Sequence, residues 1–368
     1  MVKLARWSLH FYSLPYRRKV VWANAVELAG AYALLVIEGD NGKRGFAEGT
    51  LKPTWSGVSP NSLKAAFEDF IMPRLDGIDI AAPAAVNQAL AGIAENRLAK
   101  GMVDSASWLL QSATSGTPLW QLWGGQPEVD LTWAITRQPP AMMAREAADM
   151  CTRYGFRTLK VKGGQGFDVD LQVMREIRAA VGDGVDLYVD ANSAYQRDVA
   201  ADYVGVIAGA GALVAEDPCE LWPDAEFGAL QAGSSLPILV DRNCTSVQDA
   251  RVFLDRGAIA LSTKPGRIGL SEARAINALA ASRGAKVAVG LYAESALGTL
   301  VSLQQAACLA ASQTVVAAEQ TFFLEMTDQV LACELAIAQG RVALPAVADL
   351  SALIDWEALR RHASTAPR

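Results

Sequence analysis

Lysines and carboxylates of this chain recur at a spacing that could assemble one reactive centre. Lys160 and Lys162 alternate with apolar residues in the stretch 158–164, so on a strand both ammonium groups point to the same face. Two neighbouring cations that lose solvent lower each other's pKa, and a lysine of lowered pKa can remove a proton from carbon. The Lys-x-Lys pattern by itself is more typical of an edge strand with a solvated lysine face, and the residues that follow decide against that alternative.

The carboxylates stand one structural repeat apart. Asp190, Glu216 and Asp241 each follow an apolar stretch, at intervals of 26 and 25 residues, and Lys264 follows 23 residues later. On successive parallel strands these side chains would meet at one mouth of a barrel, and the carboxylates would repel one another unless a cation lay among them. All-oxygen ligation favours Mg²⁺ first and Mn²⁺ second. A strand-end aspartate often only caps the next helix, but capping does not explain the order Lys, Asp, Glu, Asp, Lys.

Composition excludes several other kinds of protein. The 368 residues carry a formal net charge of −6, which argues against a nucleic-acid surface. The five cysteines are scattered without a Cys-x-x-Cys pair, so neither a disulfide framework nor a zinc site is expected. The only histidines, His10 and His362, lie near the two ends, which argues against a central histidine base. The start of the chain has no apolar signal region and no apolar run reaches membrane length, so we expect a cytoplasmic protein.

The elements that must position the charged residues alternate from residue 131 onward. Strands are predicted at 131–136, 158–162, 186–190, 213–216, 238–241, 260–263, 286–290 and 315–319. Helical patterns lie between them, although none is evident after the eighth strand. Eight strands at intervals of about 25–30 residues predict an α/β fold with a (β/α)8-type barrel over 126–320. Its mouth would place Lys162 and Lys264 on opposite sides of the metal site.

Residues 1–125 are predicted to form an α+β capping domain on this barrel. The predicted strands and helices are 32–38, 44–50, 61–72, 82–94 and 99–115. Two segments, near 14–24 and 50–57, mix aromatic with polar residues, as lids over polar substrates do. An ordinary surface loop is the alternative for both segments.

The C-terminal segment, 321–368, is predicted to return to the capping domain. Its pattern predicts a strand pair at 329–337 and 340–344 and a closing helix at 355–363. The chain would then consist of a capping domain, a barrel and a segment that leads back to the cap.

Taken together, these motifs resemble the enolase superfamily, in its muconate lactonizing enzyme subgroup, over nearly the whole chain. The motifs are 102–108, 118–125, Lys160-Val161-Lys162, Asp190-Ala191-Asn192, Glu216, Asp241, 264–269 and 293–298. The combined pattern is highly specific, whereas each piece alone is weak.

Three departures from the family pattern bear on function. Arg242 follows the third carboxylate, where the family usually has Glu, and this changes the charge beside the metal by two units. Leu270 stands where the family often has a second glycine, and we expect only a local change in that loop. Residues 317–320 lack the Asp-x-Asp of dipeptide epimerases, and no histidine lies in the barrel to serve as the base of the mandelate racemase subgroup.

The resemblance implies an enzyme that removes the proton next to a substrate carboxylate bound to Mg²⁺. Lys162 or Lys264 would take the proton, and the metal and Lys160 would hold the resulting enediolate. Protonation on the opposite face would give a racemase or epimerase. Loss of a β-leaving group would give a dehydratase, and ring closure run in reverse would give a cycloisomerase.

The substrate is expected to be a small-molecule carboxylate. The residues expected around it are Tyr16, Arg17, Trp55, Trp133, Asn192 and Glu294. Aromatic lids suit a cyclic or cationic molecule, which favours an amino or imino acid such as a proline derivative. The alternatives are a muconate-type cycloisomerase and a non-catalytic metal-binding barrel, and the retention of all three lysines favours an enzyme. We also expect a homo-oligomer that binds neither nucleic acid nor membranes.

Overall fold

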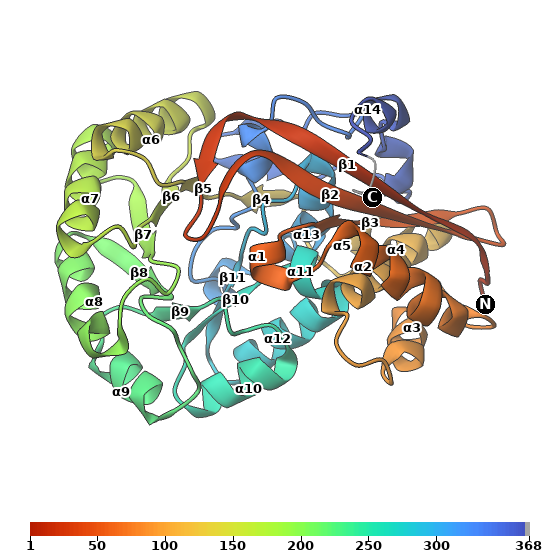
Figure 1. The fold of residues 1–368 in the computed structure, drawn as a ribbon, viewed down its shortest axis with the longest axis horizontal. Coiled ribbons are helices and arrows are strands. Elements are labelled where there is room, and N and C mark those ends of the chain that lie inside the picture. Colours follow the sequence, from red (N-terminus) through yellow and green to blue (C-terminus); the bar gives the residue numbers. More distant parts are fainter. Residues whose placement is uncertain (365–368) are drawn as a thin grey trace.

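A curled sheet of seven parallel strands forms the centre of the computed structural model, which describes residues 1–364 (Figure 1). Each strand lies next to the one that follows it in sequence, from β5 to β11. The strands are β5 (Trp133–Ile135), β6 (Thr158–Lys162), β7 (Asp186–Asp190), β8 (Ala212–Glu216), β9 (Ile238–Val240), β10 (Ala260–Thr263) and β11 (Lys286–Val289). Most of their side chains are buried, as is typical of parallel strands that are covered by helices.

Helices cover the outer side of this sheet (Figure 1). They are α6 (Pro140–Tyr154), α7 (Phe167–Val181), α8 (Ala200–Gly209), α9 (Ala225–Gly233), α10 (Val247–Asp255), α12 (Leu270–Ser282) and α13 (Ala296–Ala306). In α7, Val173, Met174 and Ile177 recur at helical spacing and are buried, whereas Arg175 is exposed. The alternation of strands and helices confirms the predicted α/β fold class.

The eighth predicted strand, 315–319, is not a strand in the structure. Residues 314–319, here called the seam, contact β11 and the residues before β5 through single bridges rather than a continuous ladder. On one side the nitrogen of Glu319 donates to the oxygen of Val289 (2.9 Å). On the other side the nitrogen of Ala318 donates to the oxygen of Asp130 (3.0 Å). The seam therefore joins the two ends of the sheet without regular strand geometry. The predicted segment lies where an eighth strand was expected, but it is not a strand.

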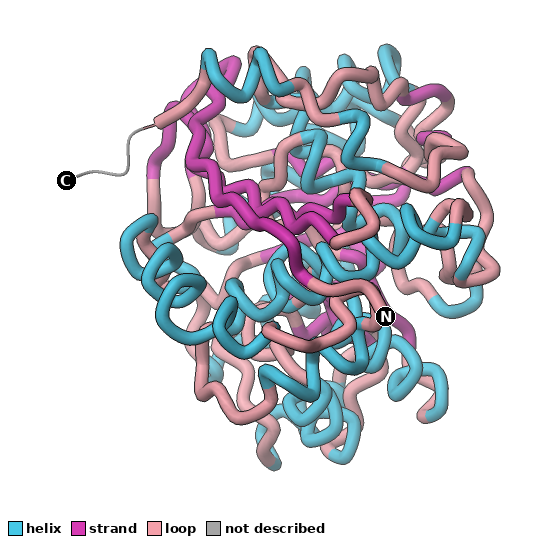
Figure 2. Tube along the Cα trace, turned by 90° about the vertical axis from the view of Figure 1, so that its right-hand side faces the viewer, coloured by secondary structure: helices cyan, strands magenta, loops and turns pink. Residues whose placement is uncertain are grey.

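The capping region is an antiparallel sheet backed by helices. Its strands are β1 (Leu4–Val21), β2 (Val26–Gly39) and β3 (Arg44–Thr50), and Figure 2 shows the long strands side by side in magenta. The helical elements are α2 (Pro60–Ala65), a π-helical turn (Ala66–Ile71), α3 (Pro83–Leu90) and α4 (Arg97–Ser115). Apolar residues of α4 such as Met102, Val103 and Ala106 pack with the sheet in a core of their own. The hairpin and the helices predicted from the sequence are present, with shifted bounds.

The two predicted lids differ in structure from the expectation of loops. Residues 14–21 continue β1, whose pairing with β2 shifts register between Pro15 and Val20, as it also does between Leu4 and Arg6. A prediction of a loop at 14–24 was therefore wrong for most of its length, because a local bulge rather than a loop carries these polar residues. The second lid, 50–57, contains the single-turn helix α1 (Pro53–Ser56).

The C-terminal segment returns to the cap, as expected. The nitrogen of Ser13 donates to the oxygen of His362 (3.1 Å), and the nitrogen of Ser364 donates to the oxygen of Phe11 (3.0 Å). The predicted strand pair is shorter than expected: β12 (Ile337–Ala338) and β13 (Arg341–Ala343) form a sheet with β4 (Glu128–Asp130), and the closing helix is α14 (Trp356–Arg361). The last four residues of the predicted segment 321–368 lie outside the described residues, and the division at 125 and 320 stays a prediction.

Within residues 1–364 no helix combines the length and the apolar character that crossing a membrane would require.

Candidate active site

The charged residues singled out from the sequence converge at the C-terminal ends of the barrel strands. Lys162 ends β6 and lies in register with Asp190 at the end of β7, which in turn lies in register with Glu216 at the end of β8. Asp241 directly follows β9 and Lys264 directly follows β10. Because parallel strands in register end at one level, the three carboxylates lie between the two lysines, in the order that the sequence predicts.

Lys160 occupies the centre of this cluster. Its ammonium nitrogen lies 2.7 Å from Glu216, 2.9 Å from Glu319 and 3.2 Å from Asp190, and all of these side chains are buried. Burial alone would lower the pKa of Lys160, but the three carboxylates raise it well above its ordinary value. The expectation that Lys160 and Lys162 lower each other's pKa is therefore wrong for Lys160, which is held as a cation.

The other two lysines also pair with the carboxylates. The nitrogen of Lys162 lies 2.5 Å from the Oδ2 atom of Asp190, and Lys264 donates to the Oδ2 atom of Asp241. Burial opposes the ionised form of Asp190, yet Lys162 and Lys160 bring its pKa well below the ordinary value. The cluster is thus a set of buried charges in which each ammonium group pairs with at least one carboxylate at the strand ends.

The donor set suits a hard divalent ion in type and burial. The Oε2 atom of Glu216 and the Oδ1 atom of Asp241 are buried and accept no hydrogen bond, and only ion pairs reach them, from Lys160 at 2.7 Å and Arg267 at 3.6 Å respectively. Burial, followed by repulsion from Asp190, raises the pKa of the Glu216 carboxyl, so an added cation would relieve a real electrostatic penalty. Across residues 1–364, no three Asp, Glu, His or Cys side chains are already arranged around a metal-sized space, because lysine nitrogens stand among the carboxylates. Asp190, Glu216 and Asp241 are the residues that would hold the ion.

Asn192 and Glu294 lie at this cluster. Asn192 has a left-handed backbone (φ 51°), and both its backbone nitrogen (2.8 Å) and its side-chain amide (3.0 Å) donate to the carboxylate of Asp190. Asn192 therefore orients Asp190. Glu294 is buried beneath the single-turn helix α11 (Pro265–Ile268), which follows Lys264, since a Cβ on Gly266 would lie 2.7 Å from its Oε1 atom. Burial raises the pKa of Glu294 to about 7.

The capping region reaches this mouth through Trp55. The ring of Trp55 lies 5.5 Å from the nitrogen of Lys264 and 5.6 Å from the guanidinium carbon of Arg242. The segment 50–57 therefore covers the end of the barrel at which the lysines stand.

Comparisons with known proteins agree with this architecture. Residues 16–124 match the family model "Mandelate racemase / muconate lactonizing enzyme, N-terminal domain", and residues 142–358 match "Enolase C-terminal domain-like". The chain belongs to the enolase superfamily. It falls in the muconate lactonizing enzyme-like subgroup, and it is accordingly an enzyme of the isomerase or lyase type.

Individual relatives are named for several different reactions. An o-succinylbenzoate synthase of Geobacillus stearothermophilus is 32% identical over 69% of this chain and 65% of its own length, so this chain spans just under two thirds of that relative. An L-Ala-D/L-Glu epimerase of Clostridium acetobutylicum is 30% identical over 75% of this chain and 78% of its own. The solved structure of a muconate lactonizing enzyme from Pseudomonas fluorescens has a TM-score of 0.92 at 24% identity, covering 99% of this chain and all of that one. Superfamily enzymes of this group generally depend on a divalent metal.

Two residues predicted to contact the substrate make other contacts in this superfamily member. Trp133 faces α6, where its ring nitrogen donates to Glu146 (2.9 Å) and its ring stacks on Phe156. Neighbouring residues of a strand face opposite sides, and Trp133 is on the helix side of β5 rather than the interior. Arg17 is exposed and donates to the carbonyl oxygen of Leu324 (2.9 Å), so the bulge of β1 directs it to the C-terminal segment. The assignment of Trp133 to the substrate site was wrong, whereas that of Arg17 stays a prediction.

Tyr16 lies in the junction between the cap and the C-terminal segment. It is buried and packs edge-on against Phe322, with ring centroids 5.4 Å apart. Burial, with the nearby charge of Glu27, raises the pKa of its hydroxyl. A direct contact with substrate stays a prediction for Tyr16.

Two charged residues near the mouth were not identified from the sequence. Lys52 is buried, lies 2.7 Å from Glu27, and stands over the ring of Trp22 at 4.2 Å. Burial lowers the pKa of Lys52, and the charge of Lys162 adds to this shift. Glu319, at the end of the seam, was noted only for the absence of an Asp-x-Asp motif. Because Glu319 ends the eighth predicted strand, the same reasoning that identified Asp190 and Glu216 could have identified it as part of the site.

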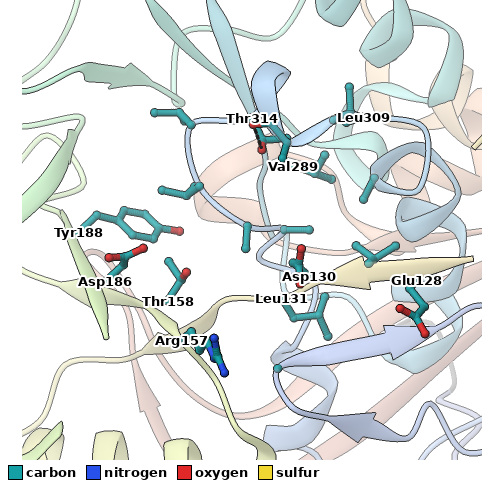
Figure 3. A pocket seen from close by; sticks show the side chains of 18 of the residues that line it. Glu128, Asp130, Leu131, Arg157, Thr158, Asp186, Tyr188, Val289, Leu309 and Thr314 are labelled. Atoms are coloured by element: carbon teal, nitrogen blue, oxygen red, sulfur yellow. Dashed lines mark hydrogen bonds between the residues drawn. The ribbon is translucent and has the colours of Figure 1, made fainter. Parts of the chain in front are cut away.

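A cavity of about 550 Å³ lies at the opposite end of the barrel (Figure 3). Arg157, Thr158 and Asp186, at the N-terminal starts of β6 and β7, line it. Tyr188 also lines this cavity, and its hydroxyl donates to Glu319 at 2.7 Å. The cavity lies at the starts of the strands, whereas the lysine cluster lies at their ends, so it is not the place where the candidate chemistry occurs.

Proposed function

We propose that this protein transfers a proton at the carbon next to a substrate carboxylate, with Lys162 and Lys264 as paired acid and base. The observation that carries this proposal is their placement. Lys162 ends β6 and Lys264 follows β10, and the strands that end in Asp190, Glu216 and Asp241 lie between them. A carboxylate substrate bound over these strands would present one face of its α-carbon to each lysine, which suits a racemase or epimerase.

Mg²⁺, or Mn²⁺ in its place, would be held by Asp190, Glu216 and Asp241, and when bound it supplies Lewis-acid stabilisation of negative charge on the substrate carboxylate. The same carboxylates now pair with the lysines, so ion and ammonium groups compete for the same oxygens. Lys160, fixed as a cation by Glu319, adds positive charge beside the reacting group. Asn192 holds Asp190 in place through two hydrogen bonds.

The proton moves between lysine nitrogens and the substrate. A neutral amine on one lysine accepts the proton of the α-carbon, and the ammonium group of the other delivers a proton to the opposite face. Trp55 and the segment 50–57 cover the mouth and limit the access of water, which would otherwise compete for both transfers.

An amino-acid derivative is the substrate class that we favour, in keeping with relatives named as epimerases and racemases. A cationic proline-like molecule fits less well than the sequence suggested. The ring of Trp22 already makes a cation–π contact with Lys52, and the ring of Trp55 makes such contacts with Lys264 and Arg242. These protein cations would repel a cationic substrate, and they favour one whose nitrogen is acylated. The same charges would also suit a dicarboxylate cycloisomerase, which is the second candidate.

Exchange of the α-proton with solvent deuterium tests the proposal. Both enantiomers of a panel of N-acylamino acids are incubated in D2O with Mg²⁺ and the wild-type enzyme, Lys162→Met or Lys264→Met. Each variant is expected to lose exchange from one enantiomer and to retain some from the other. Loss of exchange in one variant only, for both enantiomers, would favour a dehydratase or cycloisomerase. Wild-type exchange in both variants would show that neither lysine is the base. A cytoplasmic location and a homo-oligomeric state are further parts of this proposal.

A further inference from the structure

Arg242 places a cation without a partner at the mouth of the barrel. Its side chain is exposed and, within residues 1–364, forms no hydrogen bond or ion pair. Its backbone is fixed, because its nitrogen donates to the carboxylate of Asp217 (2.8 Å), which also accepts from the nitrogen of Asp241 (3.1 Å). The backbone of Arg242 is therefore held in place, whereas its guanidinium group is available to bind an anion.

Trp55 restricts the positions that the guanidinium group of Arg242 can take. The guanidinium carbon of Arg242 lies 5.6 Å from the ring of Trp55, which also faces Lys264. Packing against an aromatic ring leaves the N–H groups at the edge of a guanidinium free to donate. The planar guanidinium group can donate two parallel hydrogen bonds to the two oxygens of one carboxylate. Because Trp55 already restricts the arginine side chain, less conformational entropy is lost when an anion binds.

The other cations of this mouth already have partners. Lys52 pairs with Glu27 at 2.7 Å. Arg267 donates to the carbonyl oxygens of Asp241 (3.1 Å) and Cys244 (3.0 Å). Lys162 pairs with a carboxylate of the metal set. Arg242 thus differs from its neighbours, and it stands where the sequence departs from the family's usual glutamate.

We propose that Arg242, held on Trp55, binds a second anionic group of the substrate, a carboxylate remote from the reacting carbon. The substrate would then be a dicarboxylate, with one carboxylate between Lys162 and Lys264 and the other on a tail that reaches Arg242. This inference rests on the proposed function only for the position of the first carboxylate.

Binding of unbranched dicarboxylates tests it without the need for turnover. The wild-type enzyme with Mg²⁺ is titrated by calorimetry with α,ω-dicarboxylates of increasing length and with monocarboxylates of the same chain length. At one or more lengths the dicarboxylate is expected to bind at least 10-fold more tightly than its matched monocarboxylate. In Arg242→Gln this preference should fall to within about twofold, and in Arg242→Lys, which keeps the charge but cannot donate the same two parallel hydrogen bonds, it should be intermediate. Arg251→Gln, an exposed arginine on α10, makes the same charge change and should keep the wild-type preference.

Three results would overturn the inference: no dicarboxylate preference in the wild type, a preference that survives in Arg242→Gln, or equal weakening of both kinds of ligand. The last would mean that Arg242 only holds Trp55 in place. The deuterium-exchange experiment separates this inference from the proposed function. No exchange with any carboxylate, together with an Arg242-dependent preference, would overturn the proposed function alone, whereas exchange without that preference would overturn this inference alone.

Discussion

Gly101 of α4 and Gly269, which follows the short helix α11 after Lys264, are in backbone contact. A Cβ on Gly101 would lie 2.7 Å from the nitrogen of Gly269 and 2.8 Å from the carbonyl carbon of Ile268. Neither neighbour is a flexible side chain, so an added methyl group would have to move the backbone. Through this contact a helix of the capping region fixes the position of a lysine of the barrel.

Gly101→Ala is expected to displace the loop that carries Lys264. We expect a loss of about 1–3 kcal/mol in the free energy of unfolding, as for other overpacked sites. Exchange from the enantiomer that depends on Lys264 should fall about 10-fold more than exchange from the other, because small displacements of a catalytic group are costly. Gly205→Ala on α8, where nothing lies within 4 Å of the new Cβ, is the control and should not lower either rate. Equal losses for both enantiomers would contradict the role of this contact.

Removal of divalent metal is expected to abolish α-proton exchange, and added Mg²⁺ should restore it. The reason is the convergence of Asp190, Glu216 and Asp241 at the ends of neighbouring strands, where only lysine and arginine side chains now balance their charge. Metal should also raise the Tm, by an amount equivalent to about 2.7 kcal/mol at 100 times the Kd. Exchange measured in excess chelator, with Tm followed in parallel, checks both effects, and full turnover without metal would contradict the assignment.

Glu27→Gln is expected to leave the ammonium group of Lys52 buried without a counter-charge. Because Glu27 is partly exposed, we expect a loss of only about 1–2 kcal/mol in the free energy of unfolding, less than for a fully buried pair. Replacing both residues, as Lys52→Met and Glu27→Gln together, should recover most of this loss. Urea unfolding of the two single variants and the double variant measures the interaction, and strictly additive losses would show that the pair is not coupled.

Glu325 is expected to make stability depend on pH. Burial, with repulsion from Glu146, raises the pKa of its carboxyl from an ordinary 4.5 to about 7, although Arg18 pairs with both carboxylates. The folded protein therefore keeps a proton that the unfolded chain has already lost. The contribution is present below about pH 4.5 and declines as the pH rises to about 7.

Glu325→Gln mimics the protonated carboxyl and should remove this dependence. Relative to the variant, the wild type should lose about 2 kcal/mol between pH 5 and pH 8. Free energies of unfolding at the two pH values, for both proteins, provide the comparison. A difference that stays constant with pH would show that Glu325 does not titrate in this range.

The site was predictable to the extent that its residues follow the repeat of the barrel. Lys162, Asp190, Glu216 and Asp241 each come at the end of one strand–helix unit, so their convergence follows from spacing and parallel register alone. Lys52 could not be found in this way, because it lies between β3 and α1 while its partner Glu27 lies on β2, and no periodic pattern links the two.

Orientation within short elements was the other source of error. β5 has only three residues, too few for its alternation to indicate which of them face the helices, and Trp133 was therefore placed on the wrong side. The bulge of β1 had the composition of a loop, although its flanks pair with β2. The seam had the composition of a strand, but it is joined to each neighbour by too few hydrogen bonds to form one.

The seam also determines when the barrel can close during synthesis of the chain. Ala318 pairs with residues 130 and 132, so the first and last parts of the barrel meet only after nearly 190 intervening residues have been made. Contacts between residues so distant in sequence form slowly, and exposed strand edges are prone to aggregate before they form. A growing chain that ends before the seam would carry Lys160 without Glu319, a buried cation without one of its carboxylates. The ion pair between Lys160 and Glu319 can therefore form only late in translation, and until then the edges of β5 and β11 lack their neighbour.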